Sequence, residues 1–295
     1  MNKHILFFVH GMGESYSEND YDVLWTAIAK AYCDRAKVPL DVFNNKFECV
    51  YINWQLVTSD AELTIFDAAF PQLQVGEKKL PFSGIKNPIR SLRKFITFFL
   101  GDVAAYVSEN DNNIRRTVWQ QMEPHISKGL PYSIIAHSLG SIIVFDYLFN
   151  LFEENNLFLP EYEKLEHQNE LSRNKNNQRQ VNFRNLFTLG SPIGLFMLRK
   201  GDLWKEGNKF NSIKNPVQDD TEKGIKRTWL NFYDEQDVIA FPLENLFSLN
   251  STSRDKGSIK DVLVNTGWFA IDSHTRYWQN QQVALEISQV LLRGA

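Results

Sequence analysis

The sequence has very little of several features that mark whole classes of protein. Only two of its 295 residues are cysteine, Cys33 and Cys49, which is too few for a disulfide framework. Its six histidines show none of the paired spacings typical of a zinc site. No apolar stretch reaches the roughly 18 residues that a membrane-spanning helix needs. The net charge of −3 gives no basic surplus for a nucleic-acid partner.

The first ten residues are basic and then apolar, which is also the order of a secretory signal peptide. The apolar run covers only residues 5–9, however, and a glycine motif follows at once. We therefore predict that this run is the first strand of the fold, and we expect a cytoplasmic protein.

What the sequence does contain is a regular succession of short apolar runs. Most of them are continuous rather than alternating, as is typical of strands buried on both faces of a parallel sheet. Helical patterns separate them, most clearly at 21–33, 142–153 and 277–292, so we predict a single α/β domain over residues 1–295. Its sheet should be doubly wound and mostly parallel, with about six strands and helices on both faces. The predicted strands are 5–9, 47–53, 132–136, 186–189, 228–233 and 260–265.

Two long segments interrupt this succession. Residues 55–125 exceed what one crossover needs, and they contain a helix signal at Asn87-Pro88, an N-cap followed by proline. The broad apolar stripe that follows fits either a helix packed in the core or a helical cap over an apolar pocket. Residues 161–180 are polar and predict an exposed loop.

The most informative stretch is Ala136-His137-Ser138-Leu139-Gly140. It lies between a predicted strand and a predicted helix, and small residues stand two positions on either side of Ser138. This is the nucleophile-elbow pattern, in which a tight turn exposes a serine hydroxyl at the end of a sheet. The alternative is that Ser138 only caps the helix, as serines often do. The usual pattern has glycine where this chain has Ala136, the next smallest residue.

A nucleophilic serine needs a base, and the base needs a group that orients it. His274 is the candidate base, because it is the only histidine that follows both Ser138 and the candidate acids. Asp237, in the loop after the predicted strand 228–233, is the first choice for the acid. Asp234 is the alternative, because it lies nearer the strand end, and Asp272 is a poor third candidate.

The oxyanion that forms during attack needs two N–H donors. The backbone N–H of Leu139 is one candidate, because it directly follows the nucleophile. The second should come from the loop after the first strand, where Met12 is the first choice and Gly11 the alternative. Ser191, after the fourth strand, has no helix of the elbow kind behind it and is interpreted as a wall of the site.

These motifs together resemble the α/β-hydrolase superfamily, and most of all its lipase and serine-esterase branches. The resemblance implies a Ser138–His274–Asp237 triad, an acyl-enzyme intermediate and no cofactor. It also implies a minimal six-stranded sheet, because the family's first two strands are missing. The motifs that carry it are His10-Gly11-Met12-Gly13, Ala136–Gly140, Leu189-Gly190-Ser191-Pro192, Asp237-Val238 and His274.

The sequence therefore predicts a serine hydrolase that cleaves carboxylic esters of small molecules or lipids. Transient contact with a membrane surface is compatible with a lipid ester. A thioesterase, amidase or peptidase would use the same residues, because one fold hosts many chemistries. A binding protein that keeps the fold without catalysis is the other alternative.

Overall fold

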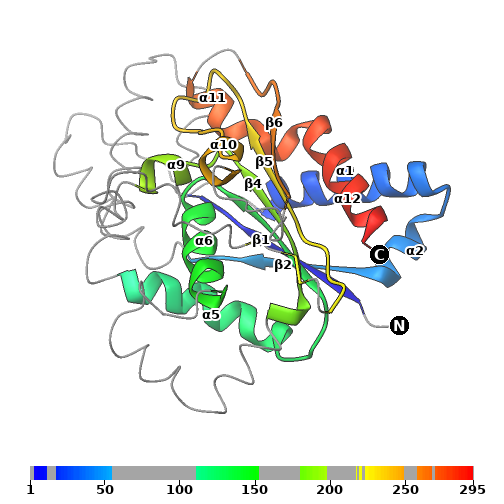
Figure 1. Ribbon diagram of the computed structural model, residues 1–295. Coiled ribbons are helices and arrows are strands. Elements are labelled where there is room, and N and C mark those ends of the chain that lie inside the picture. Colours follow the sequence, from blue (N-terminus) through cyan, green and yellow to red (C-terminus); the bar gives the residue numbers. More distant parts are fainter. Residues whose placement is uncertain are drawn as a thin grey trace, which may run out of the picture.

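The computed structural model contains a six-stranded parallel sheet with the strand order β2-β1-β3-β4-β5-β6 (Figure 1). It describes residues 3–11, 18–54, 111–152, 180–197, 217, 219–220, 223–248, 258–267 and 270–294. The strands are β1 (His4–Val9), β2 (Phe47–Ile52), β3 (Tyr132–His137), β4 (Phe183–Leu189), β5 (Thr228–Tyr233) and β6 (Ser258–Leu263).

Helices follow the strands along the chain. They are α1 (Glu18–Ala36), α2 (Leu40–Lys46), α5 (Asp111–Ile126), α6 (Leu139–Phe152), α9 (Ile193–Phe196), α10 (Glu244–Ser248), α11 (Ala270–Thr275), the 3₁₀ helix η5 (Arg276–Gln279) and α12 (Gln281–Arg293).

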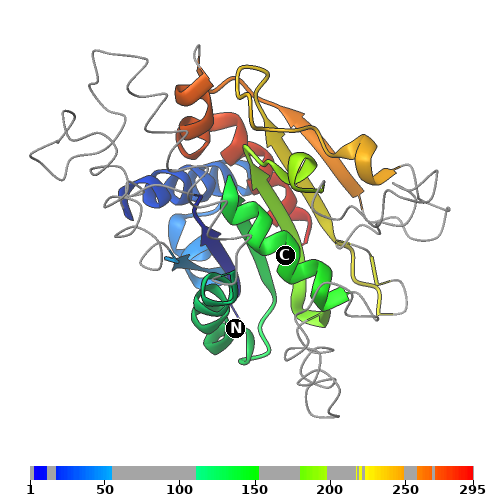
Figure 2. The same ribbon diagram turned by 90° about the vertical axis from the view of Figure 1, so that its left-hand side faces the viewer.

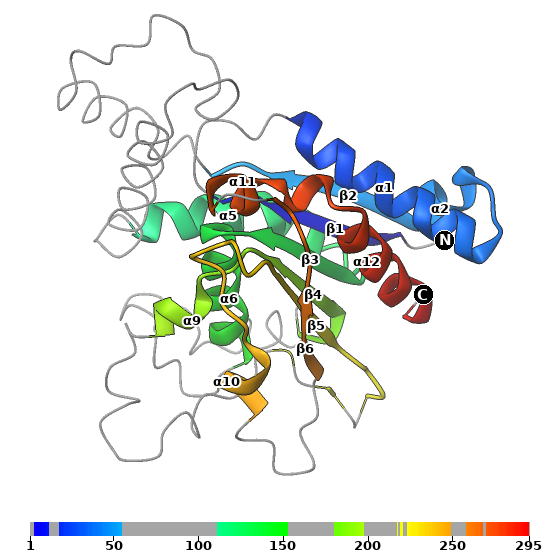
Figure 3. The ribbon, with the colours of Figure 1, turned by 90° about the horizontal axis from the view of Figure 1, so that it is seen from above.

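Both faces of the sheet are buried, and each strand feeds both of them. In β1, Ile5, Phe7 and Val9 pack in one core with residues of α5 and α6, whereas Leu6 and Phe8 pack in the other with residues of α1 and α12. This alternation follows from the two-residue period of a strand. Figure 3 shows α1 and α12 on one side of the sheet and α6 on the other, and Figure 2 gives the view turned about the vertical axis. The arrangement confirms the predicted fold class, a doubly wound parallel sheet of six strands with helices on both faces.

The chain changes direction across the sheet at β1. This strand pairs with β2 on one side and with β3 on the other, so the connections from β1 and from β3 run outward in opposite directions. Functional sites of open α/β sheets lie at such a switch point, beyond the carboxyl ends of the strands. The loop at Gly11 after β1 and the turn at Ser138 after β3 meet there.

The predicted strands agree with the observed ones apart from a few residues at their ends. The predicted helix at 277–292 is wrong in one respect, because the chain is extended at Asn280 (φ −79°, ψ 120°) between η5 and α12. The Asn280 side chain accepts hydrogen bonds from the backbone N–H groups of Gln282 and Val283, at 2.9 and 3.2 Å. It therefore acts as the N-cap of α12 and starts a new helix.

The long segment at 55–125 is described only in its last part. There α5 lies on the sheet, with Ile114, Val118, Met122 and Ile126 in the same core as α6, as a crossover helix between β2 and β3 does. Residues 55–110, which include the helix signal at Asn87-Pro88, lie outside the described residues, as do 161–179 of the polar segment. The cap and the exposed loop therefore stay predictions.

Candidate active site

Ser138 stands in a sharp turn between a strand and a helix. Strand β3 ends at His137 and helix α6 begins at Leu139, so Ser138 alone joins them. Its φ of 51° lies in the left-handed region, which costs a non-glycine residue roughly 1–2 kcal/mol. The Ser138 N–H donates to the carbonyl of Leu189 on β4 (3.0 Å). The surrounding structure thus holds a backbone conformation that serine does not favour, as the elbow pattern predicts.

Two glycines allow the turn to pack against the loop after β1. A Cβ atom at Gly140 would lie 2.2 Å from the carbonyl oxygen of His10, and one at Gly11 would lie 2.5 Å from Cβ of Ser138. Neither distance is possible for a real side chain. The backbone at Gly11 therefore passes directly against the serine, and the first turn of α6 lies against His10.

A chain of buried hydroxyl groups fixes the turn from the other side. The hydroxyl of Ser141 donates to the carbonyl of Ser138 (2.5 Å) and lies 2.7 Å from the hydroxyl of Ser191. The N–H of Ile193 donates to Ser191 Oγ (3.3 Å), which leaves the Ser191 proton for Ser141. Each group donates once and accepts once, so the chain is fully satisfied. Ser191, interpreted from the sequence as a wall of the site, is thus a support of the turn.

The structure brings the three predicted triad residues together. Ser138 Oγ lies 2.7 Å from His274 Nε2, and His274 Nδ1 lies 2.8 Å from Asp237 Oδ2. All three residues are almost completely buried, with 0, 2 and 3% of their surface exposed, so these bonds form in a medium of low dielectric constant. The side chain of Asp272, the third candidate acid, lies outside the described part of the chain.

Asp237 is held as a carboxylate by several donors. Its Oδ2 atom accepts from His274 and from the hydroxyl of Tyr277 (3.0 Å), and its Oδ1 atom accepts from the N–H of Ile239 (3.2 Å). Burial alone would raise the pKa of Asp237, but the charge interaction with His274 and these hydrogen bonds outweigh it and lower the pKa below its usual value. The acid is therefore ionised at neutral pH and able to stabilise a charged imidazole.

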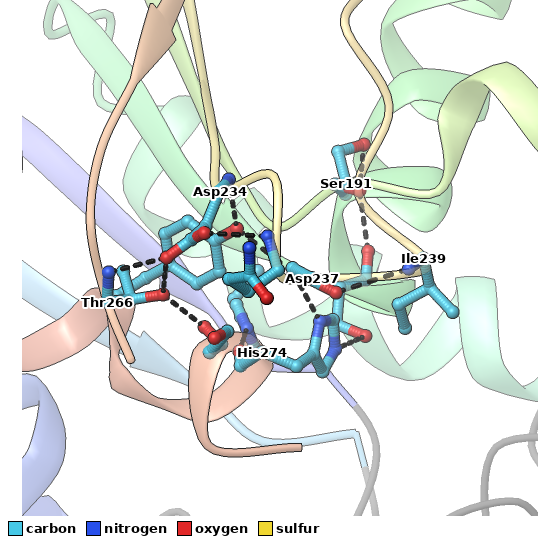
Figure 4. A network of polar contacts seen from close by, with 12 residues as sticks. Ser191, Asp234, Asp237, Ile239, Thr266 and His274 are labelled. Atoms are coloured by element: carbon cyan, nitrogen blue, oxygen red, sulfur yellow. Dashed lines mark hydrogen bonds and ion pairs between the residues drawn. The ribbon is translucent and has the colours of Figure 1, made fainter. Parts of the chain in front are cut away.

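Asp234, the alternative acid, points to other partners (Figure 4). Its carboxylate accepts from the N–H of Gln236 (2.8 Å), the N–H of Thr266 (2.6 Å) and the hydroxyl of Thr266 (2.8 Å). The same hydroxyl lies 2.6 Å from the carbonyl oxygen of Ser273, the residue before His274. Burial would raise the pKa of Asp234, yet the hydrogen bonds outweigh it and leave the pKa lowered. Asp234 thus ties the loop after β5 to the segment that carries the imidazole.

His137 supports His274 from below. Its Nε2–H donates to the carbonyl oxygen of His274 (2.6 Å), and the centroids of the two imidazole rings lie 4.8 Å apart. Burial, and next the nearby His274, lower the pKa of His137 well below its usual value. The ring is therefore neutral, and its contact is a hydrogen bond to the backbone of His274.

His10 braces the loop that faces Ser138. Its ring stacks on Trp54 at a 5.3 Å centroid distance and 7° between planes. Nδ1 donates to the carbonyl of Gly11 (2.5 Å), and the indole N–H of Trp54 donates to the carbonyl of His10 (2.9 Å). Burial lowers the pKa of His10 to about 4, so this ring too is neutral.

The candidate oxyanion donors are described in part. Leu139 is the first residue of α6, and the first N–H groups of a helix have no partner within it. Its N–H thus lies beside Ser138 with no acceptor inside α6, and the positive end of the helix dipole lies there as well. Gly11 lies against Ser138, whereas Met12 lies outside the described residues. Both assignments stay predictions.

Sequence analysis missed three residues of this site: Tyr277, Thr266 and Ser141. For two of them a signal exists. Tyr277 follows His274 by three residues and Ser141 follows Ser138 by three, which is about one helical turn and brings side chains to the same face. Thr266 has no such signal, because only the fold brings it to Asp234.

The described residues provide no site for a bound metal, since no three His, Cys, Asp or Glu side chains among them converge. None of the helices in the described segments is both long and apolar enough to cross a bilayer.

Comparison with known proteins gives a distant structural likeness. No protein-family model and no curated protein matches the chain. Among solved structures, a dienelactone hydrolase from Anabaena variabilis aligns with 99% of this chain and 87% of its own, at 12% identity and a TM-score of 0.38. The chemistry of the site must therefore be argued from its own geometry.

Proposed function

We propose that this chain is a serine hydrolase that cleaves carboxylic esters through an acyl-enzyme intermediate. The observation that carries the proposal is the unbroken path from Ser138 Oγ through the imidazole of His274 to Asp237, with hydrogen bonds of 2.7 and 2.8 Å. A serine in a left-handed turn between β3 and α6 supports it, because this backbone holds the hydroxyl beyond the sheet.

In this mechanism Ser138 attacks the ester carbonyl while His274 Nε2 takes its proton. The imidazole becomes charged, and Asp237 stabilises that charge and holds the ring in place. The oxyanion accepts hydrogen bonds from the N–H of Leu139 and from that of Met12 or Gly11. His274 then returns the proton to the leaving alcohol. Water cleaves the acyl-enzyme by the same route, with His274 again acting first as base and then as acid.

The substrate class is the less constrained part of the proposal. An ester of a small molecule or of a lipid fits the machinery, and a lipid ester would bring the enzyme into transient contact with a membrane surface. A thioesterase, amidase or peptidase differs only in the leaving group. Our proposal is ester cleavage by a cytoplasmic enzyme that uses no cofactor.

A fluorophosphonate probe and a substrate panel test the proposal. The wild-type protein should be labelled on Ser138 and should hydrolyse p-nitrophenyl esters, with a preferred acyl length. Ser138→Ala should lose labelling and lose turnover by several powers of ten while its thermal melting is retained. Exclusive turnover of acyl-CoA or amide substrates would replace ester cleavage by one of the alternative reactions. A folded wild-type protein that is not labelled at all would favour a binding protein.

A further inference from the structure

Tyr277 contacts both Asp237, the first choice for the acid, and the backbone of Asp234, the alternative. It lies in η5, one turn after His274, and it is completely buried. Its hydroxyl lies 3.0 Å from Asp237 Oδ2, and the backbone N–H of Asp234 points at the same hydroxyl from 2.9 Å. The tyrosine therefore contacts the candidate acid itself and the main chain three residues before it.

The chemistry of the neighbours fixes the direction of these hydrogen bonds. A backbone N–H can only donate, so the N–H of Asp234 donates to the tyrosine oxygen. A carboxylate can only accept, so the tyrosine proton goes to Asp237. Burial, and next the charge of Asp237, raise the pKa of Tyr277 far above its usual value. The phenol therefore keeps its proton and acts as a fixed donor.

The oxygen of Asp237 that Tyr277 contacts is the one that His274 uses. His274 Nδ1 and the tyrosine hydroxyl both donate to Oδ2, whereas Oδ1 accepts from the N–H of Ile239. Both donors interact with the negative charge on this one oxygen. The hydrogen bond from Tyr277 stabilises the carboxylate, so the carboxylate stabilises a protonated imidazole less strongly.

We propose that Tyr277 is a positioning residue that tempers the basicity of Asp237 and thereby lowers the pH at which His274 becomes able to act as a base. This inference rests on the proposed function, because it assigns a role within the same triad. Tyr277 contacts no reacting atom and acts only through Asp237.

The other groups around the pair leave this role to the tyrosine. From β3, His137 contributes a neutral ring, and its hydrogen bond goes to the backbone of His274. From the loop after β5, the Asp234 carboxylate is turned to Thr266 and Gln236. Among the described residues, no other side chain donates to Asp237 in the contacts that the structure records.

Gly190, at the end of β4, closes the remaining side. A Cβ atom there would lie 2.7 Å from Cε2 of Tyr277, 3.0 Å from Asp237 Oδ2 and 3.2 Å from His274 Nδ1. The glycine backbone thus lies against the junction of all three groups, and a side chain at this position would displace them. The φ of 55° at Gly190 favours glycine there as well.

The test compares Tyr277→Phe with wild type over the pH profile of kcat/KM for an ester. The ring keeps its shape, and only the hydroxyl is lost. We expect the acid limb of the profile to move to higher pH by about half a unit, because the charge on Asp237 Oδ2 then acts on the imidazole of His274 alone. The matched control is Tyr32→Phe, which removes a buried hydroxyl on α1 that accepts a hydrogen bond from Nζ of Lys46 (3.2 Å). Its profile should stay that of wild type.

A second variant should shift the acid limb of the pH profile in the opposite direction, and it keeps the hydroxyl group. A site-specifically incorporated fluorotyrosine at position 277 has a more acidic phenol and donates more strongly, so the acid limb should move to lower pH. An acid limb that stays in place in both variants, or moves the same way in both, overturns the inference. The proposed function fails separately, if the wild-type protein neither reacts with a fluorophosphonate nor hydrolyses esters.

Discussion

The N–H of Asp237 donates to the backbone carbonyl of Asp234 at 3.0 Å, yet the two carboxylates point to different halves of the site. Asp237 faces the imidazole of His274. Asp234 faces Thr266 and, through it, the backbone before His274. One tight turn thus contains a carboxylate suited to charge stabilisation and another suited to holding a loop.

Substitution by asparagine should separate these two roles. Asp237→Asn should lower kcat by about 10³- to 10⁴-fold, because the amide cannot stabilise a charged imidazole and favours the wrong tautomer. Asp234→Asn should keep kcat within about tenfold and instead cost about 2 kcal/mol of unfolding free energy, because an amide group would face donors. Ester kinetics and urea unfolding measure both. A nearly silent Asp237→Asn beside an inactive Asp234→Asn would mean that the acid assignment is wrong.

Gly11→Ala should damage the site through its contact with Ser138. The added methyl group would lie 2.5 Å from Ser138 Cβ and 3.1 Å from the carbonyl oxygen of His137, so the loop or the turn must move. We expect a loss of about 1–3 kcal/mol of unfolding free energy and a fall in kcat of at least about tenfold. Gly294→Ala is the control, because its added atom meets nothing closer than 3.7 Å. Full activity of Gly11→Ala would show that the contact is not needed.

The hydroxyl chain behind the turn should matter for activity more than for stability. Ser141→Ala and Ser191→Ala each break the hydroxyl chain that ends on the carbonyl of Ser138. For each variant we expect kcat/KM to fall about tenfold and the free energy of unfolding to fall by about 1 kcal/mol. Ser288→Ala is a matched control, because this buried hydroxyl also donates to a backbone carbonyl, that of Leu285 (2.7 Å), but within α12. Equal losses of activity in all three variants would contradict a specific role of the chain.

Stability should fall as the pH decreases from about 6.5 to about 4. Burial lowers the pKa of His4 and of His10 to about 4, whereas in the unfolded chain these rings bind protons near 6.5. In this window the unfolded state therefore binds more protons, and each histidine contributes up to about 1.4 kcal/mol per pH unit. Urea unfolding between pH 7.5 and 4.5 measures the slope.

His4→Gln is the informative variant for this pH dependence. His4 lies at the start of β1, away from the triad, and its Nε2 atom lies 2.9 Å from the hydroxyl of Ser133. Glutamine can keep that hydrogen bond but does not titrate. The dependence of the unfolding free energy on pH should therefore become weaker by the contribution of one histidine. An unchanged slope would show that His4 is not a source of the effect.

The sequence was sufficient for the sheet because its strands are buried on both faces. Short continuous apolar runs such as 5–9 and 132–136 are typical of strands inside a parallel sheet. The observed strands differ from the predicted ones only at their ends. The break at Asn280 was missed, because the apolar period of α12 continues across it and the cap depends on a single side chain.

The site was predictable in its order along the chain but not in its geometry. Ser138 and His274 stand out because a motif surrounds one and the required order leaves only one histidine for the other. Asp234 and Asp237 lie in the same loop, so only the turn between them decides which carboxylate meets the imidazole. The spacing of Tyr277 from His274 places the two on one helical face, but its contact with Asp237 and the approach of Gly190 to both join distant segments, which no local pattern encodes.

The central place of β1 also has a consequence for how the molecule is made. Of the six described strands β1 comes earliest in this sequence, yet one of its two neighbours, β3, follows more than 120 residues later, as the pairing of Ile5 with Tyr132 shows. Until then, the growing polypeptide carries an apolar ribbon with an open edge, a template for misassociation. We therefore expect chaperone dependence during translation and slow refolding from denaturant, because β1 must pair with the distant strand β3 that precedes Ser138.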